Sequence, residues 1–338
     1  MSAGTPLDPA RFADLLVGYC LDVKEGEEVL VRATTLAEPL LLEIQRAVLE
    51  RDAWPLLRVE LPGSTAAHYE HARDVHLDGF AEVSYAEAKK AHCQIAIQAP
   101  ENTRALVGID PERLARAARA RKPVRDQIMK KRWCTTLWPT QANAQQAGMN
   151  LGAFQAFVAR ALFLDQPDPV RSWGELRAFQ AGLVERLECA KELRIQKSGT
   201  DLRLGVGGRT WVNSDGRRNM PSGEVFTGPH ERSATGRIQF DVPSSPAGVE
   251  VSGVTPSFAT ARSSQGRPSA ATHICSGRWP PTTARAGSAR SGSARTSASS
   301  SRSGRFSSTK RSAARCTWRS GVRTPKRAGG TSPPCTGT

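Results

Sequence analysis

Acidic residues are absent from the last part of the sequence. No Asp or Glu follows Glu250, whereas 15 of the 47 Lys and Arg residues do. The first 250 residues therefore hold 32 basic and 32 acidic residues, and the formal net charge of +15 belongs to the remainder. A neutral body followed by a basic segment is typical of a protein with an arm that binds nucleic acid. One interpretation is therefore an α/β protein with an Arg- and Ser-rich nucleic-acid-binding tail.

Long hydrophobic runs and a regular cysteine pattern are also absent. No stretch approaches the roughly 20 apolar residues that span a bilayer, and the N-terminus lacks the basic and apolar regions of a signal peptide. The seven Cys residues show no regular spacing and no CxxC pair, so neither a disulfide framework nor a thiolate zinc site is indicated. We therefore expect a cytoplasmic protein with buried thiols and no membrane partner.

Helical and strand patterns alternate over residues 1–190. Residues 9–22 and 36–51 have apolar positions at helical spacing, and residues 29–31 and 54–60 have the composition of buried strands. A strand, a helix and a second strand at this spacing form a βαβ unit, which requires a parallel sheet. The sequence therefore predicts an N-terminal α/β domain.

The pattern changes near residue 190. From Leu193 to Val254, short strand-like segments alternate with turns, which predicts a β-rich domain over residues 191–255. Residues 256–338 consist mostly of Ser, Arg, Ala, Gly, Thr and Pro. Because such a segment has too little apolar surface to offset chain entropy, we expect it to be a disordered tail.

The strongest candidate for chemistry is the loop Asn219–Pro229, whose sequence is NMPSGEVFTGP. Pro221 and Gly223 predict a bend, and the carboxylate of Glu224 is expected to project from it. Taken alone, these residues favour a solvated loop carboxylate over a functional one.

Two weaker candidates favour a structural interpretation. His68, His71 and His76 lie within the segment HYEHARDVH, and the spacing of the first two could place two metal ligands on one helix face. An exposed polar helix explains the pattern better. Residues 205–208 (GVGG) lack the Lys and Ser or Thr of a phosphate-binding loop, so a hairpin turn is favoured there.

The loop Asn219–Pro229 resembles that of the thermophilic aminopeptidase family, whose cobalt- or zinc-dependent members carry a pattern close to NMPxGEVFTxP. The segment Gly236–Phe240 matches the G-x-I-x-F strand that follows in the family, and the resemblance extends from residue 9 to about 255. It implies a metal-dependent aminopeptidase that releases N-terminal amino acids from peptides with two divalent ions (Zn, Co or Mg). It also implies that Glu224 is a metal ligand and that the intact family member is a homodimer.

The remaining ligands of this family are missing from the sequence as written. The resemblance implies a set of two Glu, two His, an Asp and a Tyr. Apart from Glu224, these belong to later patterns, which read LGE, then FDE…GGTxHxALGxSYP, then GGxNxSxxHWD. None of the three patterns occurs in this chain.

Two of the three missing patterns return when the codons of the tail are read one base out of register, and residues 292–295 permit LGE if Arg295 has an AGR codon. Back-translation of residues 306–310 permits LFDE, residues 312–325 permit GGTVHLALGRSYP, and the rest up to Thr338 permits EAGGRNVSAVHWD. The patterns follow the family order without a gap. We therefore expect a reading-frame change near residues 252–258, after which the tail is an out-of-frame product.

An out-of-frame tail changes the function expected of the chain. The family continues with Met, whose codon would create a stop directly after Thr338, as expected of such a product. If the tail were a functional basic arm, its codons would not be expected to contain the family patterns one base out of register. We therefore expect no specific nucleic-acid partner. With most ligands lost, we expect the metal pair not to be retained, the homodimer to be weakened and this chain to be inactive.

Overall fold

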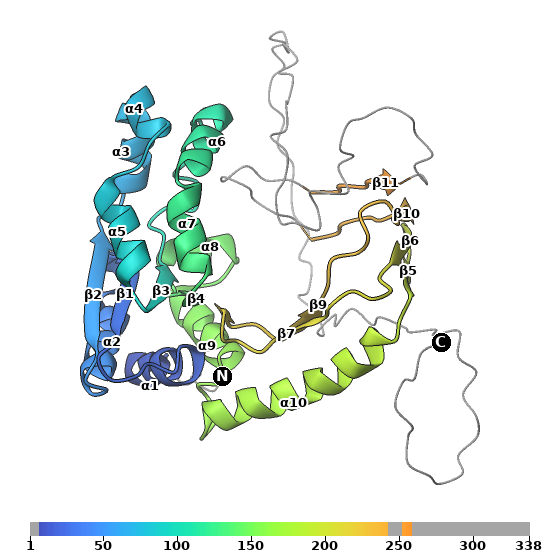
Figure 1. Ribbon diagram of the computed structural model, residues 1–338, viewed down its shortest axis with the longest axis horizontal. Coiled ribbons are helices and arrows are strands. Elements are labelled where there is room, and N and C mark those ends of the chain that lie inside the picture. The colour runs from blue at the N-terminus through green and yellow to red at the C-terminus, as the bar shows by residue number, and fades with distance from the viewer. Residues whose placement is uncertain (1–6, 243–251, 259–338) are drawn as a thin grey trace, which may run out of the picture. The chain divides into compact units, whose positions relative to one another are not determined.

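The computed structural model describes residues 7–242 and 252–258 (Figure 1). They form two compact units. The first contains residues 7–191, 206–228, 239–242 and 252–255, and the second contains residues 192–205, 229–238 and 256–258. Residues 206–228 therefore pack with the first unit, and the domain limits that we expect at residues 190 and 255 stay predictions.

A five-stranded sheet of order β2-β1-β3-β4-β8 forms the centre of the first unit. Its strands β1 (Glu28–Thr34), β2 (Trp54–Glu60), β3 (Cys93–Gln98) and β4 (Arg132–Leu137) pair in parallel with their neighbours. Helix α2 (Glu38–Leu49) connects β1 to β2 and completes the expected βαβ unit. The predicted N-terminal α/β domain with a parallel sheet is confirmed.

Helices bury the faces of this sheet. On α2, Leu40, Ile44 and Val48 recur at helical spacing, and all three are fully buried. Helices α5 and α7 pack against each other (Figure 1), as do α4 and α6. The other helices of the unit are α1 (Pro9–Asp14), the π-helix η1 (Leu15–Cys20), the 3-10 helix η2 (Thr35–Ala37), α3 (Ser64–His71), α4 (Asp74–Leu77), α5 (Glu82–Lys90), α6 (Pro111–Ala120), α7 (Lys122–Met129), α8 (Gln141–Gln146), α9 (Leu151–Ala161) and α10 (Pro169–Glu188).

The fifth strand of the sheet comes from a distant part of the sequence. Strand β8 (Asn219–Met220) lies parallel to β4, with Asn219 paired to Thr135 and Met220 to Thr136. The hydroxyl of Thr136 donates to the carbonyl of Met220 at 2.7 Å, and the Met220 side chain is 2% exposed. The loop that carries the candidate ligand Glu224 is thus anchored in the α/β unit.

Short strands follow residue 190, where the sequence predicts a β-rich region, and most of them pair antiparallel. In the first unit, β7 (Val212–Ser214) and β9 (Glu224–Phe226) form a two-stranded ribbon. The second unit is a four-stranded sheet of order β11-β10-β6-β5. Its strands are β5 (Glu192–Lys197), β6 (Thr200–Gly205), β10 (Thr235–Arg237) and β11 (Ser257–Phe258).

The expected out-of-frame tail lies outside the described residues from residue 259 onward. Just before it, Phe258 of β11 pairs with Gly236 of β10. Within the described part of the chain, no helix combines the length and the apolar character that crossing a membrane requires.

Candidate functional site

Glu224 begins strand β9 directly after a sharp bend, and its side chain is exposed. The peptide bond between Met220 and Pro221 is cis, and Gly223 has a φ of +112°. Residues with a Cβ rarely adopt this φ, and a Cβ at Gly223 would lie 3.2 Å from Cδ2 of Leu176 on α10. The expected bend at Gly223 is therefore present.

Hydrogen bonds fix the backbone around Glu224. The buried amide of Gln180 on α10 donates from Nε2 to the Glu224 carbonyl at 2.7 Å and to the Ser214 carbonyl at 3.4 Å. The Gly223 amide donates to the same Ser214 carbonyl at 3.1 Å. Across the bend, the hydroxyls of Ser214 and Ser222 lie 2.6 Å apart. Glu224 thus combines a held main chain with an exposed carboxylate.

The π-helix η1 holds the other end of this segment. Tyr19 donates from its hydroxyl to the Asp215 carbonyl at 2.9 Å, and Cys20 Sγ lies 3.5 Å from the Gly216 carbonyl. Burial and the neighbouring charge of Asp215 raise the pKa of Tyr19 to about 12, so the phenol stays a donor. π-Helical turns are often found at functional sites. The contacts of η1 with Asp215 and Gly216 therefore support the loop Asn219–Pro229 as a candidate site.

Asp215, the last acidic residue before the bend at Gly223, forms ion pairs with two arginines. Its carboxylate pairs with Arg177 Nε at 3.4 Å and with Arg217 Nε at 3.6 Å, and the Asp215 side chain is only 13% exposed. Two cationic partners leave this carboxylate poorly suited to a metal ion. It therefore acts as a structural counter-ion for the two guanidinium groups.

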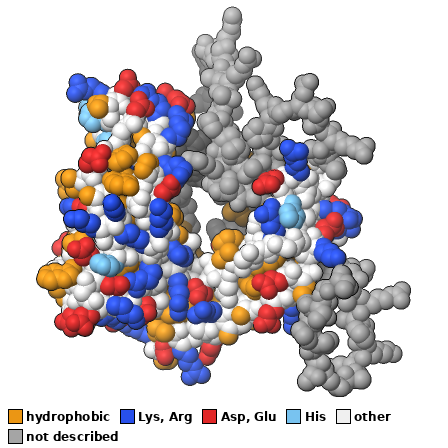
Figure 2. All heavy atoms as spheres, viewed as in Figure 1, with side chains coloured by type: hydrophobic (Ala, Val, Ile, Leu, Met, Phe, Trp, Pro, Cys, Tyr) orange, Lys and Arg blue, Asp and Glu red, His pale blue; other side chains and the backbone are white. Residues whose placement is uncertain are grey.

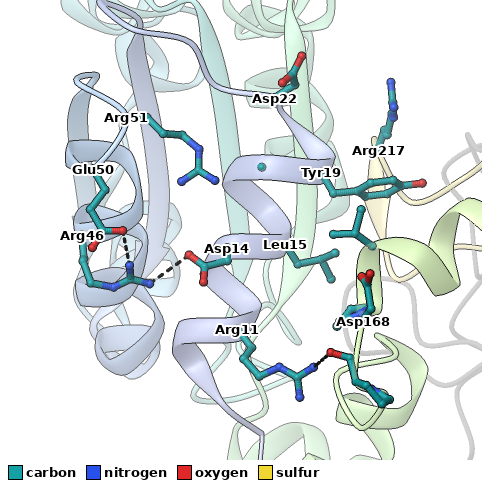
Figure 3. A pocket seen from close by; sticks show the side chains of 14 residues that line it. Arg11, Asp14, Leu15, Tyr19, Asp22, Arg46, Glu50, Arg51, Asp168 and Arg217 are labelled. Atoms are coloured by element: carbon teal, nitrogen blue, oxygen red, sulfur yellow. Dashed lines mark hydrogen bonds and ion pairs between the residues drawn. The ribbon is translucent and has the colours of Figure 1, made fainter.

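The first unit also has a surface groove of about 970 Å³ between η1, α2 and the start of α10 (Figure 3). Four arginines and four acids line it, so its formal charges cancel. Arg46 pairs with Asp14 at 3.1 Å and also with Glu50, while Arg11 donates to the carbonyl of Leu164 at 2.6 Å. These contacts tie elements together and leave no cluster of free carboxylates.

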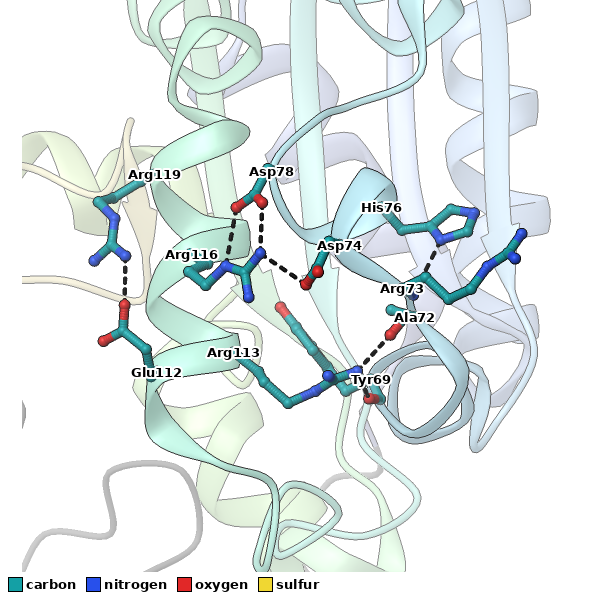
Figure 4. Close-up of polar contacts among 10 residues, drawn as sticks. All are labelled: Tyr69, Ala72, Arg73, Asp74, His76, Asp78, Glu112, Arg113, Arg116 and Arg119. Carbon is teal, nitrogen blue, oxygen red and sulfur yellow. Dashed lines mark hydrogen bonds and ion pairs between the residues drawn. The ribbon is translucent and has the colours of Figure 1, made fainter.

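The three candidate histidines are not brought together as ligands. His68 Nε2 lies 2.7 Å from Arg121 Nη2, and His76 Nδ1 accepts from the Arg73 amide at 3.1 Å. In the surrounding network, Arg116 bridges the carboxylates of Asp74 and Asp78 (Figure 4). These contacts favour the polar-helix interpretation of His68, His71 and His76.

The described residues can supply one ligand of a two-metal site, Glu224, but they do not supply the whole ligand set. Over residues 7–242 and 252–258, no three His, Cys, Asp or Glu side chains form a group that could hold a metal ion. Two cations require a bridging carboxylate and further donors, and Zn and Co favour imidazole among these. The ligands that the shifted frame would supply fall on residues from 259 onward, outside the described part.

The described surface does not favour the nucleic-acid interpretation. On the face shown in Figure 2, Lys and Arg side chains alternate with Asp and Glu side chains rather than forming one basic stripe. Basic helices α6 and α7 each contain such an ion pair, Arg119 with Glu112 in α6 and Lys122 with Asp126 in α7. The excess positive charge belongs to residues beyond the described part.

Comparisons with known proteins agree with the loop motif. Residues 8–262 match the family described as thermophilic metalloprotease (M29). The chain is 27% identical to Aminopeptidase 2 of Geobacillus stearothermophilus over 279 residues, which cover 73% of this chain and 67% of that protein. It is 28% identical to Aminopeptidase T of Thermus aquaticus over 281 residues, with the same two coverages. Wild-type AmpT from Thermus thermophilus shares the fold, with a TM-score of 0.63 and 22% identity over 75% of this chain and 69% of that one.

Proposed function

The chain belongs to the thermophilic metalloprotease (M29) family and is a metallo-aminopeptidase by descent, and from this we propose its chemistry in detail. The proposed reaction is the release of N-terminal amino acids from peptides by hydrolysis at a pair of divalent metal ions, Zn, Co or Mg. Glu224 is the proposed metal ligand among the described residues.

The exposed carboxylate of Glu224 on a fixed backbone is the observation that carries this proposal. Strand β8 and the Gly223 bend hold the main chain before Glu224, and the amide of Gln180 holds the carbonyl of Glu224 itself. With the main chain fixed, only the side-chain torsions of Glu224 have to be ordered when a cation binds. A carboxylate oxygen is also an acceptable ligand for each of the three proposed metals.

We further propose that this chain, as written, is inactive. One carboxylate cannot hold two cations a few ångströms apart, and the described residues supply no other ligand cluster. The family match ends at residue 262, close to the expected frame change near residues 252–258. The patterns that carry the other ligands are compatible only with the shifted frame. Both observations support a lost metal pair.

Two measurements test this proposal together. The first is a nucleotide read across the codons of residues 245–265 and on to the stop. The second is hydrolysis of a leucyl p-nitroanilide with added cobalt or zinc, by the full chain and by a full-length version with the frame restored. We expect no turnover by the chain as written, turnover by the restored version, and its loss in the restored Glu224→Gln variant. Turnover by the chain as written would contradict the proposal.

The cellular setting follows from the same reasoning. Among the described residues, Cys20, Cys93 and Cys134 are buried thiols without a disulfide, which supports a reducing compartment such as the cytoplasm. Peptides are the proposed substrates. The homodimer that the resemblance implies is proposed for the restored version, and sedimentation of both versions distinguishes the two states.

A further inference from the structure

Strand β2 is an open edge of the five-stranded sheet. It lies at the end of the order β2-β1-β3-β4-β8, and among the described strands it pairs with β1 alone. One side of β2 therefore has no partner strand within the described residues. An edge of this kind can pair with a strand of another chain unless charged side chains or a covering segment prevent it.

Apolar side chains stay exposed along this edge. Trp54 is 64% exposed, Val59 is 44% exposed, and Leu61, directly after the strand, is 69% exposed. Val59 shares one face of β2 with Leu57, which packs against the core that α2 helps to form. Figure 2 shows hydrophobic side chains at the left edge of the first unit, where Figure 1 places β2. An edge strand that is both open and apolar favours contact with a further strand.

Two charged residues occupy the other face of the strand. Arg58 pairs with Glu87 of α5, and Oε1 of Glu60 lies 3.8 Å from Nη2 of Arg32 on β1. The side chains of Arg58 and Glu60 are still 55% and 50% exposed, so each can reach a second partner. Charges of one sign on an edge would repel another copy of the chain. Arg58 and Glu60 have opposite signs two positions apart, which makes the edge complementary to itself in an antiparallel pair.

The charges also select one register for such a pair. When Val59 lies opposite the same residue of a second copy, Arg58 lies opposite Glu60 and Leu57 lies opposite Leu61. A register centred on Arg58 or on Glu60 places like charges opposite each other, which is destabilising. A register centred on Leu57 leaves both charges opposite apolar residues. A two-fold axis at Val59 forms both ion pairs at once, as the closed symmetry of a dimer requires.

We infer that this edge binds a second copy of the chain by antiparallel pairing of β2 with β2. The two five-stranded sheets then form one continuous sheet, with Val59 at the two-fold axis and an ion pair between Arg58 and Glu60 on each side of it. All of these residues belong to the first unit, and the contact needs neither a metal ion nor any residue after 258. The inference is therefore independent of the proposed catalytic function and of the homodimer that the family resemblance implies.

The first test is sedimentation velocity of the full chain at increasing concentration. We expect a dimer, and Val59→Lys should raise its dissociation constant at least about tenfold, because two ammonium groups then face each other at the axis. Val75→Lys is the matched control, since Val75 is exposed on α4 and not on the edge strand, and it should keep the wild-type value. A chain that sediments only as a monomer, or a dimer that Val59→Lys leaves intact, would overturn the inference.

Exchange of the two charges tests the register. Arg58→Glu and Glu60→Arg each place like charges opposite each other and should weaken the dimer, whereas the double variant restores a complementary pair and should regain most of the affinity. The contacts within one chain cannot produce this rescue, because the double variant leaves Glu87 beside a glutamate and Arg32 beside an arginine. A double variant that dimerises more weakly than either single variant would refute the pairing about Val59.

Hydrogen exchange of the wild type covers the case in which a variant does not fold. Pairing at the edge protects the outward amides of residues 57–61, so we expect their exchange to slow as the concentration rises through the dissociation constant. Exchange of residues 64–71 in α3 should stay constant. Equal exchange of residues 57–61 at low and high concentration, or protection confined to other residues, would show that β2 is not the contact.

Discussion

The hydroxyl of Tyr19 donates a hydrogen bond of 2.9 Å to the carbonyl of Asp215, although 196 positions separate the two residues. The Tyr19 ring stacks with Trp173, at 6.5 Å between ring centroids, and the guanidinium of Arg217 lies 5.4 Å from the Tyr19 ring centroid. This contact joins the π-helix near the N-terminus to the segment that ends at Glu224. It explains why a loop with little secondary structure of its own has a defined position.

Removing that hydroxyl is expected to loosen the loop. Tyr19→Phe keeps the ring contacts and deletes the hydrogen bond, so the free energy of unfolding should fall by about 1 kcal/mol. Tyr69→Phe is the control, because the Tyr69 hydroxyl has no hydrogen bond among the described residues. Urea unfolding monitored by circular dichroism gives both values. Equal stability of Tyr19→Phe and the wild type would show that the Asp215 contact does not stabilise the fold.

Gly223 is expected to tolerate no side chain. Its φ of +112° disfavours alanine, and the added Cβ would press on Leu176 at 3.2 Å. Gly223→Ala should therefore lower the free energy of unfolding by about 1 to 3 kcal/mol. Gly228→Ala, five positions later in the same motif, meets no atom within 4 Å and should change the value by less than about 0.5 kcal/mol. Similar values for the two variants would contradict the proposed strain.

Several features of this fold could be predicted because they are encoded locally. Apolar residues with helical period over α2, between two short buried runs, indicate a βαβ unit and hence the parallel pairing of β1 and β2. Pro221 and Gly223 indicate the bend before Glu224 in the same direct way. The NMPSGEVFTGP loop indicates the family, and the match over residues 8–262 confirms it.

Other features depend on contacts that no local pattern contains. Strand β8 has only two residues, and it is a strand because Thr136, 84 positions earlier, offers a free sheet edge and a hydroxyl donor. Gln180 has the polarity of a solvent-facing helix residue, yet it is 2% exposed because the ribbon covers it. Tertiary burial thus decides both cases, and sequence periodicity gives no signal for either.

The second unit offers a separate test at Gly236. This residue has a φ of +105°, and a Cβ there would lie 2.0 Å from the backbone oxygen of Asp201 on β6. Because the obstacle is backbone, Gly236→Ala should separate β10 from β6 and lower the free energy of unfolding by more than about 2 kcal/mol. Gly208→Ala is the comparison, since its φ of +69° is also positive but nothing lies within 4 Å. Hydrogen exchange of residues 200–205 reports the loss of pairing, and protection equal to that of the wild type would contradict it.

The pair formed by His68 and Arg121 predicts a pH dependence of stability. Burial first, and then the charges of Arg121 and His76, lower the pKa of His68 below its ordinary value of 6.5. The folded chain therefore binds fewer protons at His68 than the unfolded chain in the interval between the lowered pKa and 6.5. Stability must rise with pH across that interval and stay level above it. We therefore expect His68 to lower the free energy of unfolding as the pH falls from about 7.5 to about 5.

Replacing His68 by glutamine isolates this contribution. Gln keeps an acceptor near Arg121 Nη2, which lies 2.7 Å from His68 Nε2, but it does not titrate. We expect the urea midpoint of His68→Gln to fall less than that of the wild type as the pH is lowered, while the two proteins converge above pH 6.5, the ordinary pKa. His71→Gln, on the exposed surface of the same helix, is the control and should keep the wild-type slope. If His68→Gln and His71→Gln lose stability with the same slope, the Arg121 contact does not govern the acid sensitivity of this region.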